Sequence, residues 1–306
     1  MWIKEFILPA WLALVVIAWG VLPGCREESS PEKAGSKEGE EHKHQLQVTK
    51  IPPAVMDSLL LKKKRFRITR DEYWDKEGGV LGSEYLEVWY PPGQLTVTHG
   101  MHAFEQIVLA RRVCQEFFGR VPHEKLRVVC SADIDTYKEK TKRDWWYYAE
   151  IESDQIVFQP IYVLAQRGLG EVAIAHEYCQ WAVRKLSANG APRWLEEGLA
   201  SHLSGEEELL RAQMKEFSTR EQKVEWTADE IENALKRESR RDLARIAYYH
   251  AHQMTKTLIF RYGETALKMT VIRMGEGLKT DAAFAAVFKK PYDDVITEAM
   301  DYKIEI

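Results

Sequence analysis

Two stretches of sequence decide the fold: EVAIAHEYCQWA (residues 171–182) and PRWLEEGLA (192–200). The first predicts a helix, because apolar residues and alanines recur at helical spacing with no proline or glycine among them. On this helix His176 and Gln180 share one face, and Glu177 lies one residue further round. The second stretch starts a new helix at its proline. We expect helices at about 169–187 and 192–203.

Together the two stretches resemble the metal-site helices of gluzincin zinc metallopeptidases, in particular peptidase MA-like and aminopeptidase N-like proteins. These families place His-Glu-x-x-His on one helix and Trp-Leu-x-Glu-Gly-Leu-Ala on the next. Their two histidines and the Glu before Gly hold zinc, and the Glu after the first His is the general base. The resemblance implies a zincin-like fold, with His176 and Glu197 as metal ligands and Glu177 as the catalytic base.

Two positions depart from the family pattern. Gln180 stands where the second histidine is expected, and an amide oxygen is a weaker zinc donor than an imidazole nitrogen. Ser201 stands where many members have an acidic residue that orients a metal-bound histidine. We therefore expect a weakened or lost zinc site. Two functions follow: a pseudopeptidase whose cleft binds a peptide or protein, or an active zinc peptidase that uses His176, Gln180 and Glu197 as ligands.

Further residues could complete such a site. The resemblance implies a tyrosine that stabilises the oxyanion, for which Tyr249 is the better candidate and Tyr248 the alternative, although both could simply be packed aromatics. A replacement donor could come from another histidine or from a cysteine. His202 is five residues after Glu197 and points away from it on a regular helix. The other candidates are His250, His252 and Cys179, of which Cys179 is better explained as a buried core thiol.

The rest of the body predicts an α+β fold, since its strands come first and its helices afterwards. Residues 66–69, 85–90 and 126–130 are expected to be strands, 103–118 a helix, and 145–151 with 155–158 a hairpin. From Glu171 to Met300 we expect only helices, interrupted near 188–190, 205, 263, 275–277 and 291. The result is a small mixed sheet in an N-terminal lobe followed by a mainly helical C-terminal lobe. The hairpin resembles the edge at which these families bind peptide by strand addition.

The N-terminus predicts export and anchoring. An apolar run from Phe6 to Leu22 leads to Leu-Pro-Gly-Cys25, which resembles a bacterial lipobox, with an uncleaved transmembrane anchor as the alternative. Residues 1–25 are thus expected to be a lipoprotein signal, 26–48 a disordered tether and 49–306 the peptidase MA-like domain. We expect an extracytoplasmic protein anchored to the membrane through the lipid on Cys25. The formal net charge of −4 gives no indication of a nucleic-acid partner.

The remaining cysteines match no zinc-finger or paired-thiol pattern. They are Cys114, Cys130 and Cys179. In an oxidising compartment Cys114 and Cys130 could form a disulfide, and isolated buried thiols are the other possibility.

Overall fold

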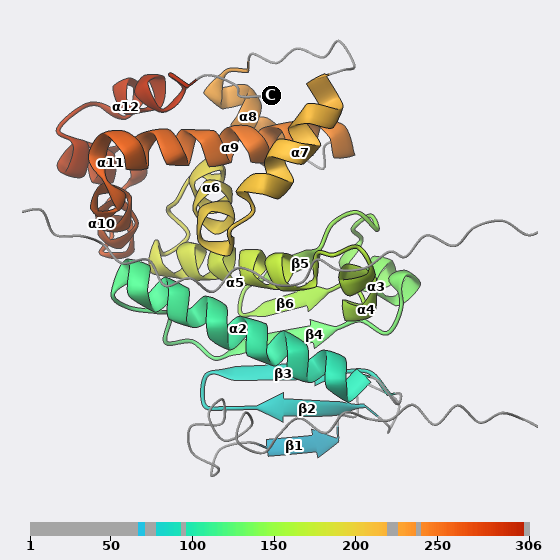
Figure 1. Ribbon diagram of the computed structural model, residues 1–306. Coiled ribbons are helices and arrows are strands. Elements are labelled where there is room, and N and C mark those ends of the chain that lie inside the picture. The colour runs from blue at the N-terminus through green and yellow to red at the C-terminus, as the bar shows by residue number, and fades with distance from the viewer. Residues whose placement is uncertain (1–66, 71–77, 93–95, 219–225, 237–239, 303–306) are drawn as a thin grey trace, which may run out of the picture. The chain divides into compact units, whose positions relative to one another are not determined.

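The computed structural model describes residues 67–70, 78–92, 96–218, 226–236 and 240–302 (Figure 1). The predicted signal segment, Cys25 and the tether lie outside the described residues. In the described part of the chain, no helix is both long and apolar enough to cross a bilayer.

The described strands form one mixed sheet in the order β1-β2-β3-β4-β6-β5 (Figure 1). Strands β1 to β3 run antiparallel, β3, β4 and β6 run parallel, and β5 is antiparallel to β6. β5 is therefore an edge strand. The bounds are β1 Arg67–Arg70, β2 Gly79–Gly82, β3 Leu86–Tyr90, β4 Leu126–Cys130, β5 Ala149–Glu152 and β6 Gln155–Phe158.

Helices cover the sheet and make up the rest of the described chain. α2 connects the parallel strands β3 and β4 and packs against β2, β3 and α5. α5 packs against β5, α6 packs against α5, and α9 packs against α6. The bounds are α2 Thr96–Phe118, α3 Ile134–Thr141, α4 Ile161–Gln166, α5 Gly170–Leu186, α6 Arg193–Ser204, α7 Glu207–Ser218, α8 Ala228–Lys236, α9 Arg241–Tyr262, α10 Glu264–Gly275, α11 Thr280–Phe288 and α12 Tyr292–Ala299.

The predicted order of elements is confirmed: a small mixed sheet precedes a mainly helical region, and no described residue after Phe158 is in a strand. The two decisive helices are α5 and α6, within two residues of the expected bounds. The break between them is a tight turn, in which Ala188 and Asn189 adopt positive φ angles of 51° and 61°. Strand β2 and helices α3 and α4 were not predicted.

The prediction that the first hairpin strand begins at Trp145 is wrong. Residues 145–148 form an irregular segment before β5. The Gln159 side-chain amide, fully buried, donates to the carbonyls of Trp145 and Tyr147. Among the described residues these carbonyls bond a side chain and not a neighbouring strand, so the aromatic composition of the segment does not make it a strand.

Two contacts fix the position of α6. Its N-cap, Pro192, has no side-chain cap, and the Glu232 carboxylate of α8 instead accepts hydrogen bonds from the backbone N–H groups of Arg193 and Trp194, both at 3.0 Å. Further along, Gly198 lets α6 approach α9 closely: a Cβ there would lie 2.4 Å from the carbonyl oxygen of Ala251. These contacts place Glu197, the residue before Gly198, in the interior of the protein.

Candidate functional site

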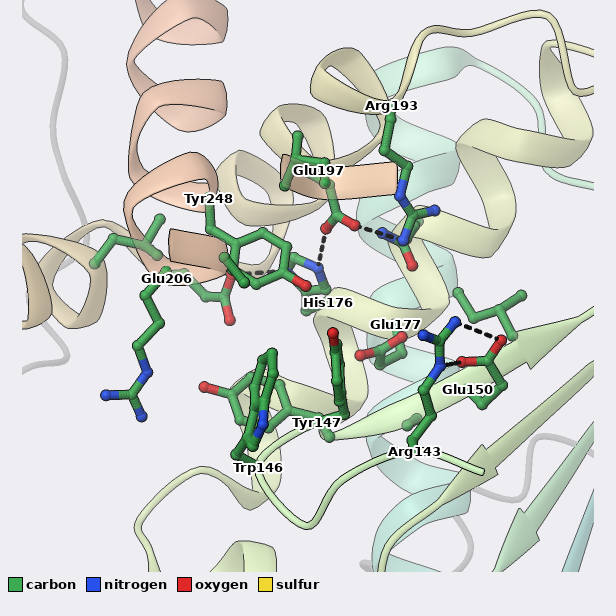
Figure 2. Close-up of a pocket in the computed structure, with 18 of the residues that line it drawn as sticks. Arg143, Trp146, Tyr147, Glu150, His176, Glu177, Arg193, Glu197, Glu206 and Tyr248 are labelled. Atoms are coloured by element: carbon green, nitrogen blue, oxygen red, sulfur yellow. Dashed lines mark hydrogen bonds and ion pairs between the residues drawn. The ribbon is translucent and has the colours of Figure 1, made fainter. Parts of the chain in front are cut away.

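His176 on α5 and Glu197 on α6 meet at the helix contact. The His176 Nε2 atom is 3.0 Å from Glu197 Oε2, and both side chains are buried (Figure 2). The structure thus brings together the two residues that the sequence singled out on separate helices. Burial alone would lower the pKa of His176, but the charge of Glu206 and the hydrogen bonds to Glu197 and Glu206 raise it well above its ordinary value.

Glu206 holds the other side of the imidazole ring. Its Oε2 atom is 2.6 Å from His176 Nδ1, and its side chain is buried. Glu206 follows Gly205, which caps α6 with a φ of 77°, and the Glu206 N–H donates to the carbonyl of Ser201. The turn after α6 therefore reverses the chain and directs this carboxylate back toward α5.

The expectation that His176 lacks an orienting acid because position 201 is a serine is wrong. Ser201 is fully buried, and its Oγ has no hydrogen-bond partner among the described residues. Glu206, five residues further along the chain, makes the contact that orients the His176 ring. Helical periodicity predicts a contact with His176 only from one helical turn after Glu197. Glu206 lies beyond the end of α6, so periodicity along this helix could not identify it.

Arg193 holds the second oxygen of Glu197. Its Nη2 is 2.7 Å from Glu197 Oε1, and its Nη1 donates to Glu196 Oε2 at 2.9 Å. Arg184 of α5 donates to the same Glu196 oxygen at 3.1 Å. Burial would raise the pKa of Glu197, but Arg193, His176 and a hydrogen bond with Gln180 lower it overall. Glu197 is thus an ionised group with partners on both oxygens.

Gln180 and Glu177 occupy the places the helix spacing predicted. Gln180 is buried, lines the same cavity as His176 and hydrogen-bonds Glu197. Glu177 also lines the cavity, with 9% of its surface exposed, and Figure 2 shows it between Tyr147 and the Arg143–Glu150 pair. Burial raises the pKa of Glu177 to about 7. A carboxyl group with this pKa can either donate or accept a proton near neutral pH.

The donor set does not fit a catalytic zinc site. Such a site needs three strong protein donors, and this one offers the imidazole of His176, the carboxylate of Glu197 and only an amide from Gln180. Among the described residues, no group of three or more His, Cys, Asp and Glu side chains could hold a metal ion. The guanidinium of Arg193 also places a positive charge at the carboxylate that would bind the ion.

The cavity in front of these residues has a volume of about 330 Å³. Its walls come from the segment 146–151, which includes most of β5, from α5 and α6, and from α7, α8 and α9. Trp146 and Tyr147 stack on one side with ring centroids 3.7 Å apart, and Arg143 lies over the Tyr147 ring (Figure 2). The cavity is thus bounded by a strand edge, by aromatic rings and by paired charges.

Of the two candidate tyrosines, Tyr248 lines the cavity and Tyr249 does not. Tyr248 lines the cavity with its hydroxyl toward His176 and Glu197 (Figure 2). Tyr249 is buried in a separate apolar cluster with Leu210 and Met214. Consecutive residues on a helix point about 100° apart, so the two neighbouring tyrosines meet different surroundings here.

None of the possible replacement donors lines the cavity. The His202 Nε2 is 3.7 Å from Glu264, and His250 Nδ1 bonds the hydroxyl of Tyr302. His252 is buried, and neither of its ring nitrogens has a hydrogen-bond partner among the described residues. Burial lowers the pKa of His252 to about 4 against the opposing effect of Glu207, with smaller effects from Lys256, His202 and Glu206.

Cys179 lies on the far side of α5 from the cavity. Its sulfur is 3.5 Å from that of Cys114 on α2, so the partner of Cys114 is Cys179 and not Cys130.

No protein-family model matches the sequence, and no curated protein is similar to it at a significant level.

Proposed function

We propose that this chain is an extracytoplasmic lipoprotein whose zincin-like domain binds an extended peptide or a protein segment without cleaving it. The protein would be anchored through a lipid on Cys25. The cavity in front of His176 would be the binding cleft. The observation that carries the proposal is that β5, which bounds this cavity, pairs with no described strand on its outer side, while the charged groups at the centre of the cavity already have partners within the chain.

The register of β5 defines how a peptide would bind. The Gln159 N–H donates to the Tyr148 carbonyl, so these two residues are a hydrogen-bonded pair. Hydrogen-bonded and non-hydrogen-bonded pairs alternate along antiparallel strands. Ala149 and Ile151 therefore belong to non-hydrogen-bonded pairs, and their N–H and C=O groups point away from β6. Strand addition would use these groups, and the side chains of the added strand would reach the aromatic wall.

The charged residues at the centre of the cavity would bind the peptide without cleaving it. The Glu206–His176–Glu197–Arg193 series is a continuous chain of hydrogen bonds and ion pairs, which holds the floor of the cleft rigid. The hydroxyl of Tyr248 and the carboxyl of Glu177 face the cavity and can bond peptide carbonyl and N–H groups.

An edge-strand substitution tests peptide binding. A proline at position 151 removes an N–H group that faces away from the sheet, and edge strands tolerate proline at such positions. Ile151→Pro should abolish binding of fluorescent casein-derived peptides to the full chain. Ile151→Ala, which loses the same side-chain packing but keeps the N–H, should bind within about threefold of the wild type. Equal binding by the two variants would exclude strand addition.

The alternative is an active zinc peptidase with Glu177 as general base and His176, Gln180 and Glu197 as ligands. Two observations favour it: the carboxyl of Glu177 faces the cavity, and Glu206 orients His176 as a ligand-orienting carboxylate would. Metal content separates the two functions. We expect the full chain, purified without chelator, to hold well under one zinc per chain and to melt unchanged in chelator.

About one zinc per chain, lost in Glu197→Ala, together with casein hydrolysis, would overturn the non-catalytic proposal. Gln180→His supplies the missing imidazole and should raise zinc affinity. For the anchor, Cys25→Ala should move the chain from the membrane to the soluble fraction. An unchanged membrane fraction would contradict lipid anchoring.

A further inference from the structure

Two thiols from distant parts of the sequence meet in the core beneath the site. Cys114 of α2 and Cys179 of α5 are 65 positions apart, and their sulfur atoms are 3.5 Å apart. Both residues have no exposed surface. The contact lies where α2 packs against α5, in the same apolar cluster as Phe118 and Trp181.

The geometry is close to that of a disulfide. A disulfide has an S–S bond of about 2.05 Å, so the sulfurs need to approach by only about 1.5 Å. Rotation about the Cα–Cβ bonds can move a sulfur by this amount. The third described cysteine, Cys130, ends β4 and is a buried free thiol.

We propose that Cys114 and Cys179 form a disulfide that links α2 to α5 in the mature protein. The inference rests on the exported location proposed above, because structural disulfides form in oxidising compartments. The bond forms by thiol–disulfide exchange with a disulfide donor, either an oxidoreductase or a small-molecule disulfide. The two thiols lose their protons and two electrons to the donor, which leaves as two thiols.

Burial sets the time at which the bond forms. Neither sulfur is accessible in the folded chain, so exchange takes place during folding, before α2 and α5 close over the pair. The same burial then shields the bond from reductants. The link would anchor the back of the helix whose front carries His176, Glu177 and Gln180, and so limit movement of the cleft floor.

Peptide mapping tests the pairing directly. The full chain carrying Cys25→Ser is refolded with reduced and oxidised glutathione, then unfolded in N-ethylmaleimide and digested with trypsin without reduction. Cleavage at arginine and lysine gives separate peptides for each thiol: 113–120 for Cys114, 128–138 for Cys130 and 168–184 for Cys179. We expect the first and third joined by a disulfide, and the second modified by N-ethylmaleimide.

Thermal denaturation provides an independent readout. A bond that closes a loop of this length should raise the melting midpoint by roughly 5 to 15 °C over the reduced chain. Cys130→Ala should keep this sensitivity to reductant, whereas Cys179→Ala should lose it. The mapping needs no core substitution, so it remains decisive if a variant fails to fold.

Three maleimide-modified thiols after refolding, or a link that includes the Cys130 peptide, would overturn the pairing. If the pair forms in glutathione but the chain isolated from its membrane carries free thiols, the inference about the mature protein fails. Fractionation of the same cells then shows whether the exported location fails with it.

Discussion

The close approach of α6 and α9 predicts a large effect of one added methyl group. In Gly198→Ala, the new Cβ would lie 2.1 Å from Thr255 Oγ1 and 2.4 Å from the carbonyl oxygen of Ala251. The threonine side chain can rotate away, but the carbonyl belongs to the backbone of α9. The helices must therefore separate by about 1 Å to restore ordinary contact, which lies beyond 3.4 Å.

A gap of this size removes a quarter to a half of the attraction between atoms along the contact. Overpacking of this kind costs about 1 to 3 kcal/mol, occasionally more, and the better helix propensity of alanine returns about 1 kcal/mol. We expect a net loss of about 1 kcal/mol in the free energy of unfolding, or roughly 2 to 4 °C in melting midpoint. Urea and thermal unfolding of the full chain, followed by circular dichroism, measure both quantities.

Two matched variants make the test specific. At Gly170 of α5 an added Cβ meets its nearest atom at 3.5 Å, so Gly170→Ala should leave stability within about 0.5 kcal/mol of the wild type. Adding Thr255→Ala to Gly198→Ala removes only the side-chain clash, so the double variant should remain destabilised. If Gly198→Ala is as stable as Gly170→Ala, the reasoning from the helix contact is refuted.

Three further predictions concern stability. Glu232→Ala removes the carboxylate that caps α6 and should cost about 1 to 2 kcal/mol, measured by urea unfolding, while Asp229→Ala, an exposed acid in the first turn of the same helix, should cost only about 0.5 kcal/mol; equal costs would contradict the capping role. His252 has a folded-state pKa of about 4 against an ordinary 6.5, so the unfolded chain binds more protons and stability should fall as the pH drops through this window, by up to about 3 kcal/mol. His252→Phe should remove that part of the pH dependence, and an unchanged slope between pH 6.5 and 4 would refute the assignment. Tyr292→Phe leaves the indole N–H of Trp194 without its 3.1 Å partner and should cost about 1 kcal/mol in thermal unfolding, so a variant as stable as the wild type would refute it.

The local elements of the site could be predicted from the sequence because their signals are local. The proline before α6 and the apolar spacing of α5 depend on neighbours within a few residues, and α5 and α6 appear where expected. The positions of His176, Glu177 and Gln180 on one helix follow from helical geometry alone. The meeting of His176 with Glu197 was expected only through a resemblance between two stretches of sequence, and the structure places their side chains 3.0 Å apart.

Tertiary contacts decided the rest. Adjacent tyrosines 248 and 249 have the same local signal, and only the packing of α9 against α6 and α7 determines which one faces the cavity. Glu206 reaches His176 because the glycine cap turns the chain after α6, and no helical periodicity extends across such a turn.

Residues within single segments are enough to predict that a helix with His176, Glu177 and Gln180 is followed by a helix with Glu197, because propensity and periodicity act locally. The pairing of charges in the site depends on how the helices pack: Glu206 contacts one nitrogen of His176, Glu197 contacts the other, and Arg193 contacts Glu197. Electrostatic pairing depends on distances of a few ångströms between segments far apart in the chain. These distances exist only once α5, α6 and α9 have packed.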